Sequence, residues 1–64
     1  MPFVQVHIWE GRTVDQKRKL AKAITDAMVE HVDADPTGLH VAIAEYPRES
    51  WARNGVLGVD RKDV

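Results

Sequence analysis

The second residue of the chain is the first one that could carry out chemistry. Pro2 follows the initiator Met1, and removal of Met1 would leave Pro2 with a free secondary amine. An ordinary α-amino group titrates at about 7.7–8.0, and burial or nearby cations lower that value. Such an amine can act as a general base near neutral pH. Pro2 taken alone is explained more simply as the start of a strand, where its missing N–H is harmless.

Three further residues are candidates for substrate binding. Arg12 follows a glycine in a loop, where its guanidinium could hold a carboxylate through two parallel hydrogen bonds, although a solvated loop arginine explains it equally well. Trp51 could wall a pocket, with burial in a core or an interface as the simpler explanation. His40 lies on an expected inner strand and is the only histidine that we take as functional. The histidines lack metal-site spacing and the chain has no cysteine, so we expect no metal and no cofactor.

Hydrophobic patterning places these residues on a strand, a helix and a second strand. Residues 2–9 are rich in β-branched and aromatic types, which predicts a strand. Thr13-Val-Asp-Gln16 has the form of a capping box, and the spacing that follows predicts an amphipathic helix of about five turns, opening at about Thr13. The helix should end near residues 33–35, because Pro36 disfavours helical geometry before it. Leu39 to Tyr46 then reads as a second strand.

The order of these elements predicts an α/β (α+β) fold and one domain over residues 1–64. A strand, a helix and a strand with short connections form a βαβ unit, whose strands are parallel and whose crossover is right-handed. Asn54-Gly55 favours a type I′ turn, so Val56-Leu57 should form a short hairpin or an arm that pairs with a neighbouring chain.

A chain of 64 residues without cysteine has few ways to become stable alone. One helix covers one face of a two-stranded sheet, yet both strands carry apolar side chains on both faces. We therefore expect a homo-oligomer in which strands from different chains form a larger sheet.

A net charge of -1 argues against a nucleic-acid partner. The absence of a long apolar run or a signal peptide argues against a membrane partner and favours the cytoplasm.

The order of the motifs resembles one known family. The chain begins Met-Pro and continues with Gln5-Val6-His7-Ile8, Glu10-Gly11-Arg12 and Asp15-Gln16-Lys17. With these motifs it is similar to the 4-oxalocrotonate tautomerase family, from Pro2 to about Leu57. The resemblance implies a tautomerase-like βαβ protomer, dimers that share a four-stranded sheet, and usually a hexamer built as a trimer of dimers.

The resemblance also implies an activity and a role for each site residue. Pro2 would be the general base or acid after removal of Met1, Arg12 would bind a substrate carboxylate, and Trp51 would close the pocket. The implied enzyme is an isomerase that needs no cofactor. It would convert a small carboxylate-bearing enol or dienol, such as 2-hydroxymuconate, to the keto form.

One position departs from the family pattern. Well-studied members carry a second arginine on the second strand, which reaches a neighbour's active site, and the matching residue here is His40. A neutral imidazole does not replace a permanently charged guanidinium, so the identity of the substrate stays open. Arg48 and Arg53, in the segment that follows, are candidate replacements.

Two other functions remain as alternatives. Dehalogenating and hydrating members of the same family use the proline as an acid and also need a carboxylate that activates water. Glu49 is the acid nearest to Trp51 in the sequence, and we rank this activity below tautomerisation. The second alternative is a non-catalytic oligomeric module that binds a small ligand. A retained Met1 distinguishes it, because blocking the amine abolishes catalysis and leaves ligand binding unchanged.

Overall fold

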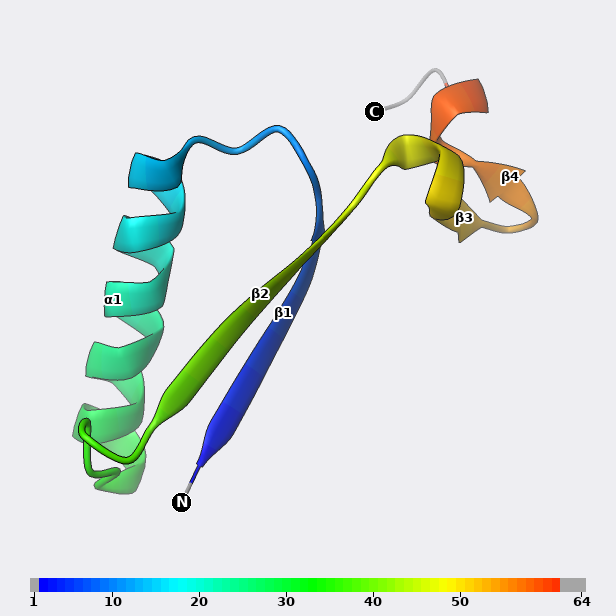
Figure 1. Cartoon of the computed structure of the whole chain (residues 1–64). Coiled ribbons are helices and arrows are strands. Elements are labelled where there is room, and N and C mark those ends of the chain that lie inside the picture. Colours follow the sequence, from blue (N-terminus) through cyan, green and yellow to red (C-terminus); the bar gives the residue numbers. More distant parts are fainter. Residues whose placement is uncertain (1, 62–64) are drawn as a thin grey trace.

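The computed structural model describes residues 2–61 and contains the predicted strand, helix and strand in that order (Figure 1). These elements are β1 (Phe3–Trp9), α1 (Val14–Val32) and β2 (His40–Tyr46). A C-terminal segment follows, with the short 3₁₀ helix η1 (Arg48–Ser50), β3 (Ala52–Arg53), β4 (Val56–Leu57) and the 3₁₀ helix η2 (Gly58–Asp60). Within residues 2–61, no helix is both long enough and apolar enough to cross a membrane.

The two ends of α1 are fixed by local hydrogen bonds. Thr13 is the N-cap, and its hydroxyl accepts a hydrogen bond of 3.1 Å from the Gln16 backbone N–H. The Gln16 side chain accepts one of 2.8 Å from the Thr13 N–H, which completes the predicted capping box. At the other end Asp33 adopts a left-handed conformation with φ 56°, and the Ala34 N–H donates to the Met28 carbonyl. The helix therefore begins and ends where the sequence predicts.

The main sheet is the parallel pair β1 and β2, as predicted. Phe3 lies opposite His40 and Trp9 lies opposite Tyr46, so the two strands start together and end together. The C-terminal hairpin pairs β3 and β4 in antiparallel fashion. Asn54 and Gly55 form its turn with φ values of 53° and 78°, as a type I′ turn requires.

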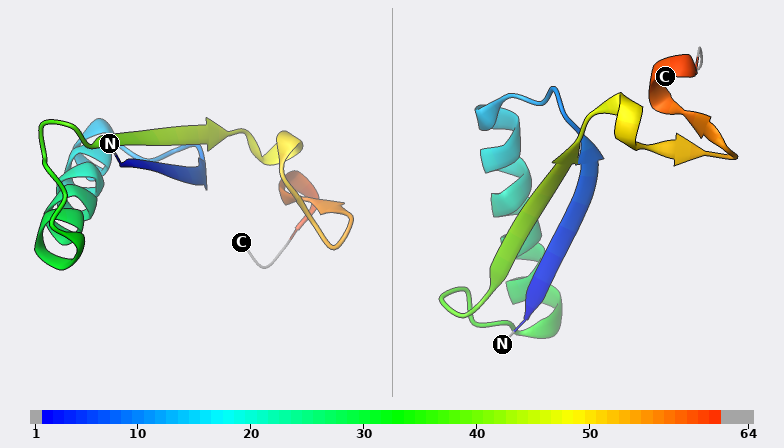
Figure 2. Two further views of the ribbon diagram at one scale, coloured as in Figure 1. Left: turned by 90° about the horizontal axis from the view of Figure 1, so that it is seen from below. Right: turned by 45° about the vertical axis from the view of Figure 1, so that its right-hand side comes forward.

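The helix α1 covers one face of the sheet and leaves the other face open (Figure 2). Lys17 on α1 donates a 2.8 Å hydrogen bond to the Glu45 carboxylate, which marks the covered face of β2. On the open face His7 Nδ1 and the Tyr46 hydroxyl are hydrogen-bonded at 2.7 Å, with their rings stacked. The C-terminal segment extends away from the sheet and the helix (Figure 1).

One chain does not form a closed hydrophobic core. Among residues 2–61 no apolar side chain is buried, and Phe3, Val32 and Val59 keep exposed fractions of 61%, 62% and 62%. The radius of gyration is 14.7 Å, whereas a compact domain of this length has one of about 11 Å. These exposed apolar surfaces support the prediction that other chains cover the fold.

Candidate active site

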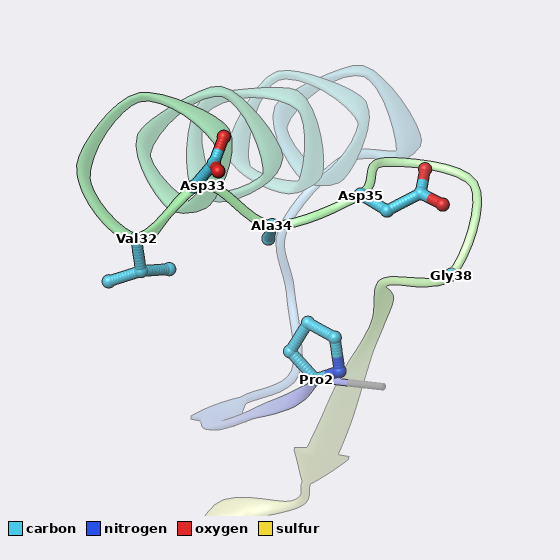
Figure 3. A pocket seen from close by; sticks show the side chains of 6 residues that line it. All are labelled: Pro2, Val32, Asp33, Ala34, Asp35 and Gly38. Atoms are coloured by element: carbon cyan, nitrogen blue, oxygen red, sulfur yellow. The ribbon is translucent and has the colours of Figure 1, made fainter.

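Pro2 lines a concave pocket together with the end of α1 and the segment that follows it. The pocket has a volume of about 530 Å³. Besides Pro2 it is lined by Val32, Asp33, Ala34, Asp35 and Gly38 (Figure 3). The Pro2 carbonyl accepts a 3.2 Å hydrogen bond from the His40 backbone N–H, which fixes Pro2 beside the start of β2. Met1, whose removal would free the amine, lies outside the described residues.

Two carboxylates belong to this pocket, and sequence analysis did not place them there. Asp33 caps α1 and Asp35 lies in the loop to β2, with their carboxylates directed away from the Pro2 ring in Figure 3. Asp35 accepts hydrogen bonds from the Thr37 hydroxyl at 2.8 Å and from the Thr37 N–H at 3.0 Å. These hydrogen bonds lower the pKa of Asp35, so its carboxylate stays charged at neutral pH.

The four site residues predicted from the sequence fall into two groups at opposite ends of the sheet. His40 is paired with Phe3, and so it lies at the same end as Pro2. Arg12 follows the other end of β1, and Trp51 lies beyond the matching end of β2. A strand of seven residues separates its ends by about 20 Å. A single chain thus brings Pro2 and His40 together and keeps them apart from Arg12 and Trp51.

Trp51 belongs to a cluster of aromatic rings at its end of the sheet. Its ring meets the Trp9 ring edge to face, with centroids 6.5 Å apart and planes at 87°. It also meets the Tyr46 ring at 5.4 Å and 61°. The Arg48 guanidinium lies over the Trp9 ring, 4.5 Å from its centroid, in cation–π geometry. Trp51 is therefore held by contacts with the last residues of both long strands.

Gly58 fixes the other side of this cluster. Its N–H donates a 2.7 Å hydrogen bond to the Trp51 carbonyl. A Cβ atom on Gly58 would lie 2.6 Å from the Trp9 ring, closer than any side chain allows. The absence of a side chain at Gly58 lets the C-terminal segment pack directly on Trp9. Sequence analysis gave no role to Gly58, because only the tertiary contact shows why a larger residue does not fit.

Comparison with known proteins identifies the family of the chain. The family described as "Tautomerase enzyme" matches residues 2–61. A probable tautomerase from Streptococcus pneumoniae serotype 4 is 40% identical over 57 residues, which cover 89% of this chain and 95% of the relative. A 2-hydroxymuconate tautomerase from Comamonas testosteroni is 38% identical over 64 residues, covering 100% of this chain and 97% of the relative.

Solved structures agree with the sequence comparison. A heterohexamer 4-oxalocrotonate tautomerase from Chloroflexus aurantiacus J-10-fl superposes with a TM-score of 0.89 and 26% identity. The alignment covers 97% of this chain and 100% of that chain. The chain belongs to the tautomerase family, with the 4-oxalocrotonate tautomerase fold, and its activity class is that of an isomerase.

Proposed function

We propose that this tautomerase acts on a small enol or dienol that carries a carboxylate, such as 2-hydroxymuconate, with the Pro2 amine as general base and acid. The observation that carries this proposal is the position of Pro2, which directly precedes β1 and lines the 530 Å³ pocket. Two relatives that match the full length of this chain at 38% identity are 2-hydroxymuconate tautomerases, which supports this substrate class.

The complete site needs residues from more than one chain. Pro2 and His40 lie at one end of the parallel sheet, whereas Arg12 and Trp51 lie at the other. A neighbouring chain that pairs with the sheet in the opposite direction would bring its far end to the first chain's Pro2. Symmetric pairing of this kind repeats the same contact at both ends of a dimer. The substrate would then lie between Pro2 of one chain and Arg12 and Trp51 of its neighbour.

Each of these groups has a distinct task in the proton shift. The neutral Pro2 amine removes the hydroxyl proton of the dienol, and the O–H electron pair forms the carbonyl. The conjugated electrons shift along the carbon skeleton of the substrate, and the carbon at the far end of the diene takes a proton from the protonated amine. This step gives an α,β-unsaturated ketone and restores the neutral amine. Arg12 holds a substrate carboxylate through charged hydrogen bonds. Trp51 excludes water from the site.

Assembly follows from the same geometry. The open sheet face and the exposed apolar residues Phe3, Val32 and Val59 need cover from other chains. We propose a homo-oligomer, most simply a hexamer built from three dimers. Each dimer would extend β1 and β2 into a four-stranded sheet. The same contact that completes the hydrophobic core would then complete the site.

The amine of Pro2 is the feature to test. Pro2→Ala leaves a primary amine, and we expect weak residual activity toward 2-hydroxymuconate, because general acid–base catalysis is worth about 10²–10⁴-fold. A form that retains Met1, verified by intact mass, should be less active still, because the nitrogen of Pro2 is then an amide without useful basicity. Equal kcat/KM for the parent and both variants would contradict this mechanism. If the parent binds the ligand without turnover, and a retained Met1 leaves that binding unchanged, a non-catalytic module would be favoured.

One observation favours a second candidate function. Hydrating and dehalogenating enzymes need a carboxylate that activates water, and Asp33 and Asp35 both line the Pro2 pocket. The hydrogen bonds from Thr37 lower the pKa of Asp35, whose carboxylate is ionised at neutral pH. Release of chloride from 3-chloroacrylate, abolished by Asp35→Asn while turnover of 2-hydroxymuconate continues, would establish this activity. Absence of chloride release from the parent would exclude it for this substrate.

A further inference from the structure

A second, smaller cavity lies at the end of the sheet that carries Trp51. Its volume is about 80 Å³, and it is lined by Trp9, Trp51, Arg53 and Arg61. A water molecule takes up about 30 Å³ in the liquid, so the cavity has room for a group of two or three heavy atoms. Two indole rings form walls, and two guanidinium groups belong to the lining. This combination of flat apolar walls and positive charge suits a small planar anion such as a carboxylate.

The two arginines that follow β2 have different surroundings. Arg48 lies over the Trp9 ring at 4.5 Å, outside the residues that line the small cavity, and its contact holds the aromatic cluster in place. Arg53 is on β3 and lines the cavity together with Trp51. Of the two arginines, Arg48 is thus engaged with the aromatic cluster and Arg53 is the one that lines the cavity.

Trp9, which lines the same cavity, also carries a polar group. Its indole N–H is buried and has no hydrogen-bond partner within the described part of the chain. A buried donor without an acceptor is unfavourable, so an acceptor that reaches it with a ligand would be favoured. Gly58 and Arg48 hold the Trp9 ring from two sides, so this donor is held in a fixed position before any ligand binds.

We propose that this cavity is a carboxylate subsite that selects substrates with two carboxylates, with Arg53 as its specificity-determining residue and the Trp9 indole N–H as a supporting donor. The inference rests on the proposed function, in which Trp51 of the same chain faces the substrate. Arg12 takes the carboxylate next to the reacting enol, and the subsite takes the carboxylate at the other end. Specificity for a dicarboxylate then comes from the hairpin and not from His40 on β2.

Binding of two unreactive diene acids tests the subsite separately from catalysis. Muconate is a six-carbon diene whose two end carbons are carboxylates, and sorbate has a methyl group in place of one of them. We expect isothermal titration calorimetry to give the parent about 10- to 100-fold higher affinity for muconate, the range for a charged hydrogen-bonded pair. Arg53→Gln should remove this difference by weakening muconate alone. Arg53→Lys keeps the positive charge without the planar guanidinium, so it should lose part of the difference in affinity between muconate and sorbate.

Two further variants separate a direct contact from a general effect of charge. Arg18→Gln removes an equally positive side chain on the exposed surface of α1, where Arg18 pairs with Asp15, and should leave both affinities unchanged. Trp9→Phe keeps a ring and removes the N–H, so it should weaken muconate more than sorbate. Equal affinities of the parent for the two acids, or equal losses for both acids in Arg53→Gln, would overturn the proposal.

Kinetics then show whether catalysis uses the subsite. In Arg53→Gln we expect kcat/KM to fall for 2-hydroxymuconate, which has two carboxylates, and to change little for phenylenolpyruvate, which has one. A parent that turns over neither substrate would refute the proposed function, while the calorimetric comparison would still decide whether the cavity binds a carboxylate. A parallel fall for both substrates would overturn the assignment of Arg53 to specificity.

Discussion

In the proposed site, the reactivity of Pro2 would depend on charges that come from different chains. Within its own chain the nearest charged side chains of the pocket are Asp33 and Asp35, and negative charge favours the protonated amine. In the proposed site Arg12 of a neighbouring chain opposes this effect, because positive charge favours the neutral amine. The balance between them sets the pH at which Pro2 becomes a base.

Replacing Asp35 by Asn tests this balance. The substitution removes a negative charge from the pocket while its side-chain oxygen can still accept the hydrogen bonds from Thr37. The pKa of the Pro2 amine should fall, so the ascending limb of kcat/KM against pH should move to lower pH. Asp26→Asn is a matched control on the exposed surface of α1, where Asp26 pairs with Lys22. An ascending limb that stays in place in Asp35→Asn, or moves equally in Asp26→Asn, would contradict the electrostatic argument.

Arg12 should act on the substrate and not on the fold. It is exposed in the single chain, between β1 and α1. Arg12→Ala should lower kcat/KM for 2-hydroxymuconate by about 10- to 100-fold, the value of a charged hydrogen-bonding pair. The sedimentation coefficient and the thermal midpoint should stay at the parent values. Full activity in an intact oligomer would remove Arg12 from the site.

At the scale of elements, the sequence predicts structure where local physics decides it. The capping box at Thr13 and Gln16 and the break before Pro36 place α1, and parallel pairing follows from the helical crossover between two strands. That topology already contains the separation of Pro2 from Arg12, because β1 lies between them, and it places His40 near Pro2, because parallel strands start at the same end. The prediction of one pocket from Pro2, Arg12, His40 and Trp51 came from family resemblance, which gave a neighbouring chain as the source only for the position of His40.

The arrangement of the C-terminal segment was beyond sequence reasoning. Asn54-Gly55 predicts the turn, but nothing local states where the hairpin lies relative to the sheet. That position is set by contacts across the chain, where Gly58 packs on Trp9 and Arg48 lies over the same ring. The cavity lined by Arg53 exists only because of these contacts, so its residues could be named as candidates but not assembled.

A methyl group at Gly58 should disturb this arrangement. In Gly58→Ala the new Cβ would meet the Trp9 ring at 2.6 Å and the Arg48 carbonyl at 3.1 Å, so the ring must shift. Overpacking of this kind costs about 1–3 kcal/mol. We expect lower stability to urea and altered near-ultraviolet circular dichroism. Gly38→Ala is the matched control, since its Cβ has ordinary contact at 3.8 Å from the Asp35 carbonyl. Parent-like spectra in both variants would show that Gly58 does not hold Trp9.

At the scale of the whole molecule, folding and site formation have a common requirement. The chain measures 41 × 24 × 16 Å, and within residues 2–61 it buries no apolar side chain. Such a shape leaves the open sheet face and the pocket of Pro2 for other copies to complete. Composition predicts this need, because a chain of this size without disulfides requires another source of stability. The pairing geometry that fills both needs is a property of the assembly.

Mixing two impaired variants tests whether the site is shared between chains. Arg12→Ala chains supply an intact Pro2, and chains that retain Met1 supply an intact Arg12. If the two residues come from different chains, unfolding and refolding an equal mixture should restore about one quarter of the parent's sites, as random assembly of a symmetric oligomer gives. If both residues come from one chain, every site in the mixture lacks one of them. Analytical ultracentrifugation checks that the mixture reaches the parent's size, and a reassembled mixture with no activity above its separate components would disprove the shared site.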